Sequence, residues 1–191
     1  MTICFYGASS DRIGDVYKDA CRELGYRLGK LGHSLIYGGG SCGLMGAFSQ
    51  GMLDAGADVT GVVPLFMQAF ENVRKDCTDR INTDDMNTRK DIMEKNADVF
   101  IVGPGGIGTF DEFFEAVTLK QLYQHNKKII LFNVEQFFDP MVEMMRICCE
   151  KAFIKKGVFD LFHVISDMDE VIAELDRPEP KREKMNKAIY K

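Results

Sequence analysis

The sequence predicts an α/β fold in which a parallel sheet is covered by helices on both faces. Apolar runs of strand length alternate with amphipathic segments of helix length along the chain. The strand-length runs are continuously apolar, which is typical of parallel strands that are buried on both sides. Glycine-rich turns follow several of these runs. Together these observations predict a doubly wound, Rossmann-like domain whose ligand lies at the carboxyl ends of the strands.

The individual elements follow from this alternation. Strands are expected over residues 2–6, 34–37, 58–63, 97–102, 128–132 and 163–165. Helices are expected over residues 15–31, from the glycine-rich loop 38–46 to about 55, from a cap at 83 or 84 to 95, and over 109–123, 137–151 and 168–175. A polar turn, Gly7–Ser10, follows the first strand. Residues 65–82 predict only a short helix or lid around 66–70, followed by a polar stretch.

Length and composition limit the possible functions. A chain of 191 residues is expected to form one domain, here residues 1–176, followed by a basic tail over 177–191. A net charge of −5 gives no general affinity for nucleic acid, and no apolar run reaches membrane-spanning length. Six cysteines without a C-x-x-C pair predict reduced thiols, and the three histidines lie too far apart in sequence to suggest a metal site. We therefore expect a cytoplasmic protein without a metal ion.

The most informative stretch is a strand-like run that ends in a glycine-rich turn. Residues 99–102 are apolar, residues 103–108 contain four glycines and Pro104, and a helix is predicted just beyond. Glycines leave backbone N–H groups uncovered, and the first turn of a helix carries about half a positive charge. The stretch therefore predicts a binding site for an anion such as a phosphate.

Thr109 and Glu112 allow two interpretations. Their spacing is that of a capping box, in which both residues only begin the helix. Alternatively, Glu112 lines a ligand cleft, because a helical wheel places it opposite an apolar side that would pack on the sheet. That side consists of Phe110, Phe113, Phe114, Val117 and Gln121. Both interpretations remain open from the residues alone.

A second glycine loop, Gly38 to Gly46, and the first one both contain G-x-G-x-x-G. The acidic residue that would bind a ribose about 20 residues further on is missing after the Gly38 loop, which disfavours nicotinamide chemistry. The chain also has no G-x-x-x-x-G-K-[ST] sequence and hence no P-loop. Two such loops fit a mononucleotide, although tight turns without a ligand would explain either loop alone.

An arginine interrupts the apolar stripe of the helix predicted before residue 95. Met86, Arg89, Ile92 and Met93 share one side of that helix. A buried arginine needs an anionic partner, whereas an arginine that extends past the stripe to solvent does not. The two alternatives are equally compatible with the residues.

At this point the motifs resemble those of a known family. Residues 104–112, PGGIGTFDE, fit the PGGxGTxxE signature of the LONELY GUY (LOG) proteins, cytokinin riboside 5′-monophosphate phosphoribohydrolases. Met86, Arg89 and Lys90 fit the companion MxxRK element, and residues 38–46 resemble the GGGxxGLMG loop of the family. The resemblance extends from the first strand to about residue 175. Asp111 and Asn87 depart from the usual glutamate and histidine, which leaves the base preference open.

The resemblance implies hydrolysis of the N-glycosidic bond of an adenine-type nucleoside 5′-monophosphate, either N6-modified or plain AMP, to free base and ribose 5-phosphate. It assigns Arg89 and Glu112 as the catalytic pair, requires no cofactor, and implies a homodimer, for which Leu119, Leu122 and Tyr123 offer an apolar strip. The alternatives are a general purine-monophosphate nucleosidase and a non-catalytic carrier of a nucleotide or of the molybdenum cofactor. An older label for this family is lysine decarboxylase. We reject it, because no lysine in the sequence stands in a context that is typical of pyridoxal-phosphate binding. The implied substrate-binding residues are Gly39, Gly40, Glu71, Met86, Lys90, Gly105, Gly106, Ile107, Gly108, Thr109 and Thr118.

Overall fold

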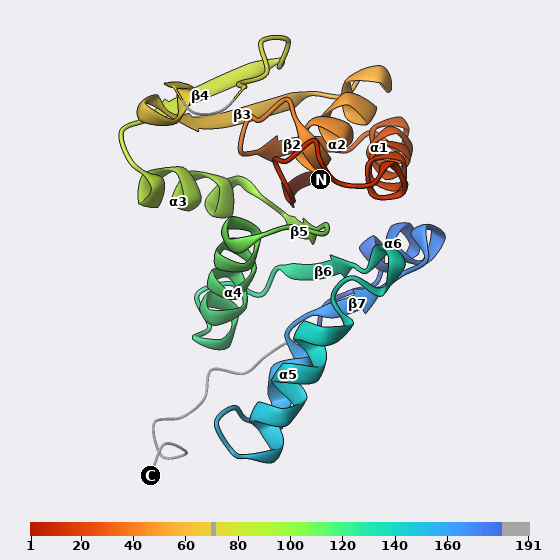
Figure 1. Cartoon of the computed structure of the whole chain (residues 1–191), viewed down its shortest axis with the longest axis vertical. Helices are drawn as coiled ribbons and strands as arrows, with labels where there is room; N and C mark the ends of the chain where they lie inside the picture. Colours follow the sequence, from red (N-terminus) through yellow and green to blue (C-terminus); the bar gives the residue numbers. More distant parts are fainter. Residues whose placement is uncertain (70–71, 181–191) are drawn as a thin grey trace.

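A computed structural model describes residues 1–69 and 72–180 and contains one seven-stranded sheet in the order β4-β3-β2-β1-β5-β6-β7. Every pairing between neighbouring strands is parallel. The strands are β1 (Thr2–Tyr6), β2 (Ser34–Tyr37), β3 (Val59–Pro64), β4 (Asp79–Thr83), β5 (Val99–Val102), β6 (Lys128–Phe132) and β7 (His163–Ile165). Figure 1 shows their succession, and the predicted doubly wound parallel sheet is confirmed.

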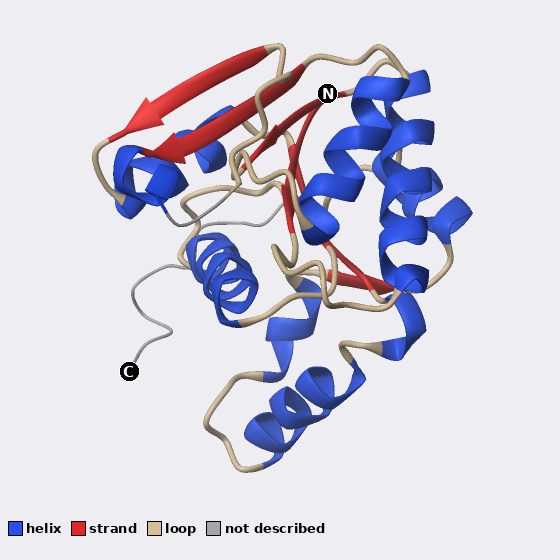
Figure 2. Cartoon of the chain, turned by 45° about the horizontal axis from the view of Figure 1, so that its top comes forward, coloured by secondary structure: helices blue, strands red, loops and turns tan. Residues whose placement is uncertain are grey.

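Helices cover both faces of the sheet (Figure 2). The α-helices are α1 (Asp15–Lys30), α2 (Gly43–Asp54), α3 (Met86–Asn96), α4 (Ile107–Gln121), α5 (Asp139–Glu150) and α6 (Met168–Leu175). Short 3-10 helices are η1 (Leu65–Ala69), η2 (Val134–Gln136) and η3 (Lys156–Asp160). One apolar core joins the sheet to α1, α2 and α6, and the other joins it to α3, α4 and α5. None of the helices in the described ranges is both long and apolar enough to cross a membrane.

The two cores follow from the alternation of side chains along each strand. Ile3 and Phe5 of β1 point into the first core, whereas Cys4 and Tyr6 point into the second. Because both faces are covered, a continuously apolar run is required, and the sequence has one in each central strand. Chain order reverses between β1 and β5, so the loops after these two strands meet at the point where doubly wound sheets bind ligands.

Three details differ from the sequence-based expectations. Residues 79–83, expected only as a polar stretch, form the edge strand β4 and are mostly exposed. Helix α3 has Asp85 as its N-cap, where Thr83 or Asp84 was expected, and the Asp85 carboxylate accepts a hydrogen bond from the Thr88 amide at 2.8 Å. Helix α4 begins at Ile107 with Gly106 as its N-cap, so the capping-box interpretation of Thr109 is wrong.

The buried side of α4 also differs from the helical-wheel prediction. Phe113 and Val117 are buried as expected, but Phe114 is exposed. Glu112 is buried on the same side as Phe113 and is not opposite the apolar stripe. The short helix or lid expected around residues 66–70 corresponds to the 3-10 helix η1, which ends at Ala69. Residue 70 lies outside the described ranges.

Candidate active site

The N-terminus of α4 presents uncovered backbone amides at the edge of the sheet. Gly106, Ile107 and Gly108 are exposed. The amides of Ile107, Gly108 and Thr109 donate no hydrogen bond to an acceptor in the described part of the chain. The N-cap Gly106 provides no side chain to accept them. These donors, together with the positive end of the helix dipole, favour an anion at this place.

The N-terminus of α2, which follows the other glycine loop, is already occupied by protein atoms. The carbonyl oxygen of Ala8 accepts hydrogen bonds from the amides of Leu44 and Met45, at 2.8 and 3.2 Å. The carboxylate of Asp11 accepts one from Gly43 at 2.8 Å, and this hydrogen bond lowers the pKa of Asp11. The two glycine loops therefore differ in their hydrogen bonding, because the amides after the loop before α4 have no acceptor among the described residues and those of α2 do.

Arg89 and Glu112 meet in the cavity from two different helices, α3 and α4. Arg89 Nη1 lies 3.7 Å from Glu112 Oε1, and the side chains are only 5% and 11% exposed. Arg89 also donates a hydrogen bond from Nε to the carbonyl oxygen of Val62, at 3.2 Å. Of the two sequence-based alternatives for Arg89, the buried and paired arginine is confirmed.

Gly38 gives the Arg89 guanidinium the space that it occupies. A Cβ atom built on Gly38 would lie 1.9 Å from Arg89 Nη2. Gly105 plays a similar part for Thr109, because a Cβ there would lie 2.1 Å from Thr109 Oγ1. Glycine is thus required at these two positions, because a larger residue would occupy the space of the Arg89 or Thr109 side chain.

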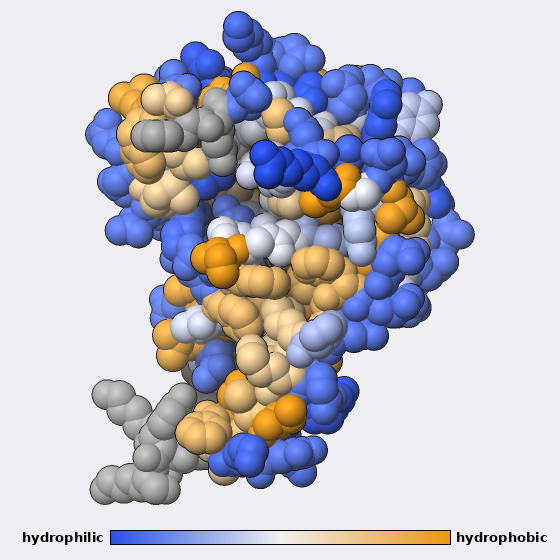
Figure 3. Space-filling model, in the orientation of Figure 1, coloured by the Kyte–Doolittle hydropathy of each residue, from blue (hydrophilic) through white to orange (hydrophobic). Residues whose placement is uncertain are grey.

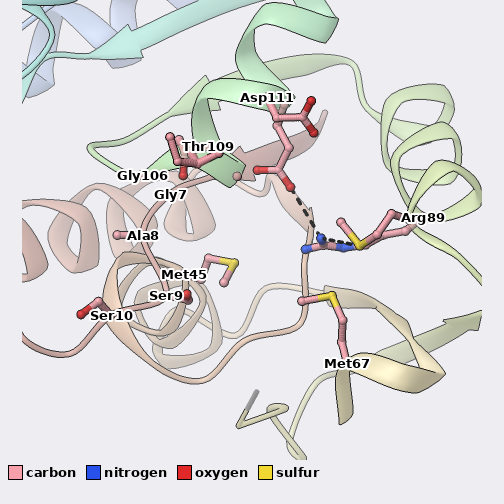
Figure 4. Close-up of a pocket in the computed structure, with 14 residues that line it drawn as sticks. Gly7, Ala8, Ser9, Ser10, Met45, Met67, Arg89, Gly106, Thr109 and Asp111 are labelled. Carbon is pink, nitrogen blue, oxygen red and sulfur yellow. Dashed lines mark hydrogen bonds and ion pairs between the residues drawn. The ribbon is translucent and has the colours of Figure 1, made fainter. Parts of the chain in front are cut away.

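These groups line a cavity of about 330 Å³, within the range of small-molecule sites. Figure 4 shows Arg89 reaching into it, with Met67 and Met45 on the side opposite Thr109 and Asp111. Its walls come from the loops after β1 and β5, from α2, α3 and α4, and from η1. The described lining residues are Gly7, Ala8, Ser9, Ser10, Met45, Met67, Met86, Arg89, Gly106, Ile107, Gly108, Thr109, Asp111 and Glu112.

Seven of the thirteen expected site residues line the cavity, five do not, and one lies outside the described residues. Gly39, Gly40 and Gly105 do not line the cavity, although Gly105 directly precedes the lining residue Gly106 and Gly40 lies against Met45. Lys90 and Thr118 also do not line it. Lys90 is held by carboxylates of α4, and Thr118, six residues after Glu112, projects from a different side of that helix. Glu71 lies outside the described residues.

Several lining residues were not singled out from the sequence. Ser9 and Ser10 were noted only as part of a polar turn, Met45 only as part of the loop 38–46, and Met67 only within the segment expected to form a short helix or lid. The adjacency of β1 and β5 places that turn beside α4, and a strand-order argument could have identified it.

Lys90 and nearby carboxylates join α3 to α4 beside the cavity. Lys90 Nζ lies 3.0 Å from Asp111 Oδ2 and also pairs with Glu115. Burial by itself would lower the pKa of Lys90, but the hydrogen bonds with Glu115 and Asp111 outweigh it and raise that pKa. Lys90 is therefore a cationic link between the helix of Arg89 and the helix of Glu112.

Glu94, one turn after Lys90 on α3, has an unfavourable electrostatic environment. Burial and the nearby Glu115 carboxylate raise its pKa from 4.5 to about 7, against the opposing effects of Lys90 and Lys127. Its Oε1 atom is buried and has no hydrogen-bond partner among the described residues. Ionised Glu94 therefore lowers the stability of the folded protein.

We expect Glu94→Gln to stabilise the protein by about 1 kcal/mol at pH 8, a value reduced for the partial exposure of Glu94. Between pH 4.5 and about 7 the folded state keeps a proton that the unfolded state has lost, so this group lowers stability as the pH rises. Urea unfolding at pH 5 and pH 8 should show the gain mainly at pH 8. Glu23→Gln, on the exposed side of α1, is the control, and an equal gain at both pH values would contradict the prediction.

The fold and the site together define an α/β protein with an uncovered helix N-terminus and a buried carboxylate–guanidinium pair in one cavity. A protein-family model described as "Possible lysine decarboxylase" matches residues 45–175. The cytokinin riboside 5′-monophosphate phosphoribohydrolase LOG1 of Arabidopsis thaliana is 34% identical over 183 residues, which are 96% of this chain and 86% of that protein. LOG of Oryza sativa subsp. japonica, which has the same name, is 34% identical over 181 residues, or 95% and 75% of the two chains.

The chain belongs to the LOG family, whose curated members named above are cytokinin riboside 5′-monophosphate phosphoribohydrolases. Among solved structures, the molybdenum cofactor carrier protein MCP of Chlamydomonas reinhardtii superposes with a TM-score of 0.68 and 22% identity over 91% of this chain and 94% of that chain. At this identity the likeness concerns the fold alone.

Proposed function

We propose that this protein hydrolyses the N-glycosidic bond of nucleoside 5′-monophosphates with an adenine-type base and releases the base and ribose 5-phosphate. The observation that carries the proposal is the buried Arg89–Glu112 pair, at 3.7 Å, in a cavity that also contains the N-terminus of α4. The names of the curated relatives support the reaction, and N6-prenylated and plain AMP are the substrates to compare.

The 5′-phosphate is assigned to the amides of Ile107, Gly108 and Thr109. A phosphate there accepts hydrogen bonds from donors that no described protein atom uses, and the helix dipole favours its charge. Glu112 follows one turn later on the same helix, so a nucleotide anchored by its phosphate would place its ribose near that carboxylate. This arrangement makes the phosphate a determinant of productive binding.

The reaction breaks the bond between C1′ and the base nitrogen. The electron pair of that bond leaves with the base, which takes up a proton, and a water oxygen forms the new bond to C1′. The ribose passes through an oxocarbenium-like state, whose positive charge a carboxylate stabilises. Glu112 can stabilise this charge, hold a ribose hydroxyl or accept the proton of the attacking water, while Arg89 orients Glu112 or stabilises the departing base.

The main alternative is a carrier that binds a nucleotide or a molybdenum cofactor without breaking it. The structural likeness to a molybdenum cofactor carrier is the reason to test it. A buried acid paired with a guanidinium beside the anion site favours the enzyme instead, because binding a phosphate does not require that pair. The decarboxylase description is not favoured, since the described lining residues include no lysine that could form a Schiff base with pyridoxal phosphate.

Incubation of the protein with AMP, N6-isopentenyl-AMP and GMP, followed by chromatography of the free base, tests the proposal. We expect release of base together with ribose 5-phosphate, and a rate for adenosine at least about tenfold lower because the phosphate contacts are missing. Tight binding of nucleotide without base release would favour the carrier. Comparable rates with GMP would favour a general purine-monophosphate nucleosidase.

We further propose that the protein is a homodimer. Exposed apolar residues gather over the region of β6 and α5 on the face shown in Figure 3. On α5, Met144 is 55% and Ile147 42% exposed, and Leu122, just after α4, is 52% exposed. Burial of such side chains against a second copy is favourable. Light scattering should give twice the chain mass of 21.6 kDa, and a mass of one chain would overturn this proposal.

A further inference from the structure

Helix α4 carries a fully buried lysine at the end opposite the anion site. Lys120 has no exposed surface, and it shares the buried side of the helix with Glu112. The two residues are eight positions apart, or about 12 Å along the axis. A buried ammonium without a carboxylate is costly, so its partner helps to determine how this end of the helix is held.

That partner comes from the segment after α6. Glu179 Oε2 lies 2.6 Å from Lys120 Nζ, and the Glu179 side chain is 13% exposed. Burial would raise the pKa of Glu179, but the hydrogen bond from Lys120 outweighs it and keeps that pKa below its usual value. The pair is therefore ionised and buried in the folded protein.

Other contacts hold this segment, residues 177–180, against the domain. Lys128 Nζ donates to the carbonyl oxygen of Arg177 at 2.6 Å, and Asn126 Nδ2 donates to that of Pro180 at 3.1 Å. Glu174, at the end of α6, pairs with Lys128 at 3.1 Å and with Arg177 at 2.8 Å. The segment 177–180 is thus attached at both ends, with Glu179 between the attachments.

A metal ion at the same place is not supported by these contacts. His163, Glu174 and Glu179 offer ligand atoms within 4.8 Å of one another. However, both carboxylates already pair with buried ammonium groups, those of Lys128 and Lys120. A divalent cation would have to displace these lysines or be repelled by them, so the cluster is a network of ion pairs.

We propose that Glu179 is a positioning residue, which fixes the far end of α4 through Lys120 and thereby sets the position of Glu112 in the cavity. The inference rests on the proposed function only where it concerns catalysis. One ion pair, Arg89–Glu112, holds the helix at the cavity, and the other, Lys120–Glu179, holds it at the opposite end. Both involve the same buried side, so loss of one changes the rotation or tilt of the whole helix.

Glu179→Gln in the full chain tests the proposal, with Glu143→Gln as its control because Glu143 pairs with Arg146 on the exposed side of α5. We expect the α4 amides to exchange hydrogen at least about tenfold faster in Glu179→Gln and unchanged in the control. With AMP, at a temperature where circular dichroism shows complete folding, kcat should fall about tenfold and more than KM changes. A residue that only added stability would leave kcat unchanged under these conditions.

Lys120→Met completes a double-mutant cycle. In that background the ammonium that pairs with Glu179 is absent, so Glu179→Gln should change exchange and kcat by less than about twofold. This double variant should fold and protect α4 even if Glu179→Gln alone does not fold. Equal effects of Glu179→Gln in both backgrounds, or an unchanged kcat, would overturn the proposal. If the parent protein released no base, the proposed function would fail, while hydrogen exchange would still report on the link between Glu179 and α4.

Discussion

Glu112→Gln is expected to lower kcat for base release about 10³-fold. Glutamine has nearly the same shape, but it carries no charge to stabilise an oxocarbenium-like ribose and cannot accept a proton from water. The amides of Ile107 and Gly108, the proposed phosphate site, remain unchanged, so the affinity for AMP should change only a few-fold. Single-turnover release of adenine and equilibrium binding of AMP separate these two effects.

Glu115→Gln is the matched control for this substitution. Glu115 lies on the same helix, three residues further on, and pairs with Lys90 outside the lining of the cavity. We expect it to keep the parental kcat within about twofold, because Asp111 still pairs with Lys90 when the Glu115 carboxylate is lost. If folded Glu112→Gln protein retained more than a tenth of the parental rate, Glu112 would have no essential role in the reaction.

The sheet and the glycine-rich turn before α4 could be predicted because they depend on local sequence. A continuous apolar run is needed wherever a strand is buried on both faces, and glycines before α4 leave its amides uncovered. The same local reasoning missed β4, because Asp79–Thr83 is an edge strand with mostly exposed side chains. Its pairing with β3 is made by backbone atoms, which leave no apolar pattern.

Parts of the site could not be predicted because they depend on contacts between distant segments. Lys90 is held in position by Asp111 and Glu115, which both lie more than twenty residues further along the chain. Ser9 lines the cavity because β1 lies beside β5, a pairing that follows from the topology of the doubly wound sheet and not from the local sequence around either strand. The pairing of Lys120 with Glu179 likewise joins residues that are 59 positions apart.

Gly38→Ala is expected to lower kcat/KM about 10²-fold without adding or removing any functional group. The new Cβ would lie 1.9 Å from Arg89 Nη2, so the guanidinium would have to move, and its pairing with Glu112 would be lost. The atom displaced is the end of a long side chain, and the backbone of Gly38 does not have a positive φ. The free energy of unfolding should therefore fall by only about 1–2 kcal/mol.

Gly14→Ala is the control, because the nearest atom to a Cβ there, on Tyr17, is 3.8 Å away. Its kcat/KM should equal that of the parent. Combination with Arg89→Met identifies the cause of the loss: if Gly38→Ala acts by displacing the guanidinium, it has no further effect once that group is absent. A full additional loss in the Arg89→Met background would mean that the loop itself contacts the substrate. Parental activity in Gly38→Ala would mean that catalysis does not depend on the position of Arg89.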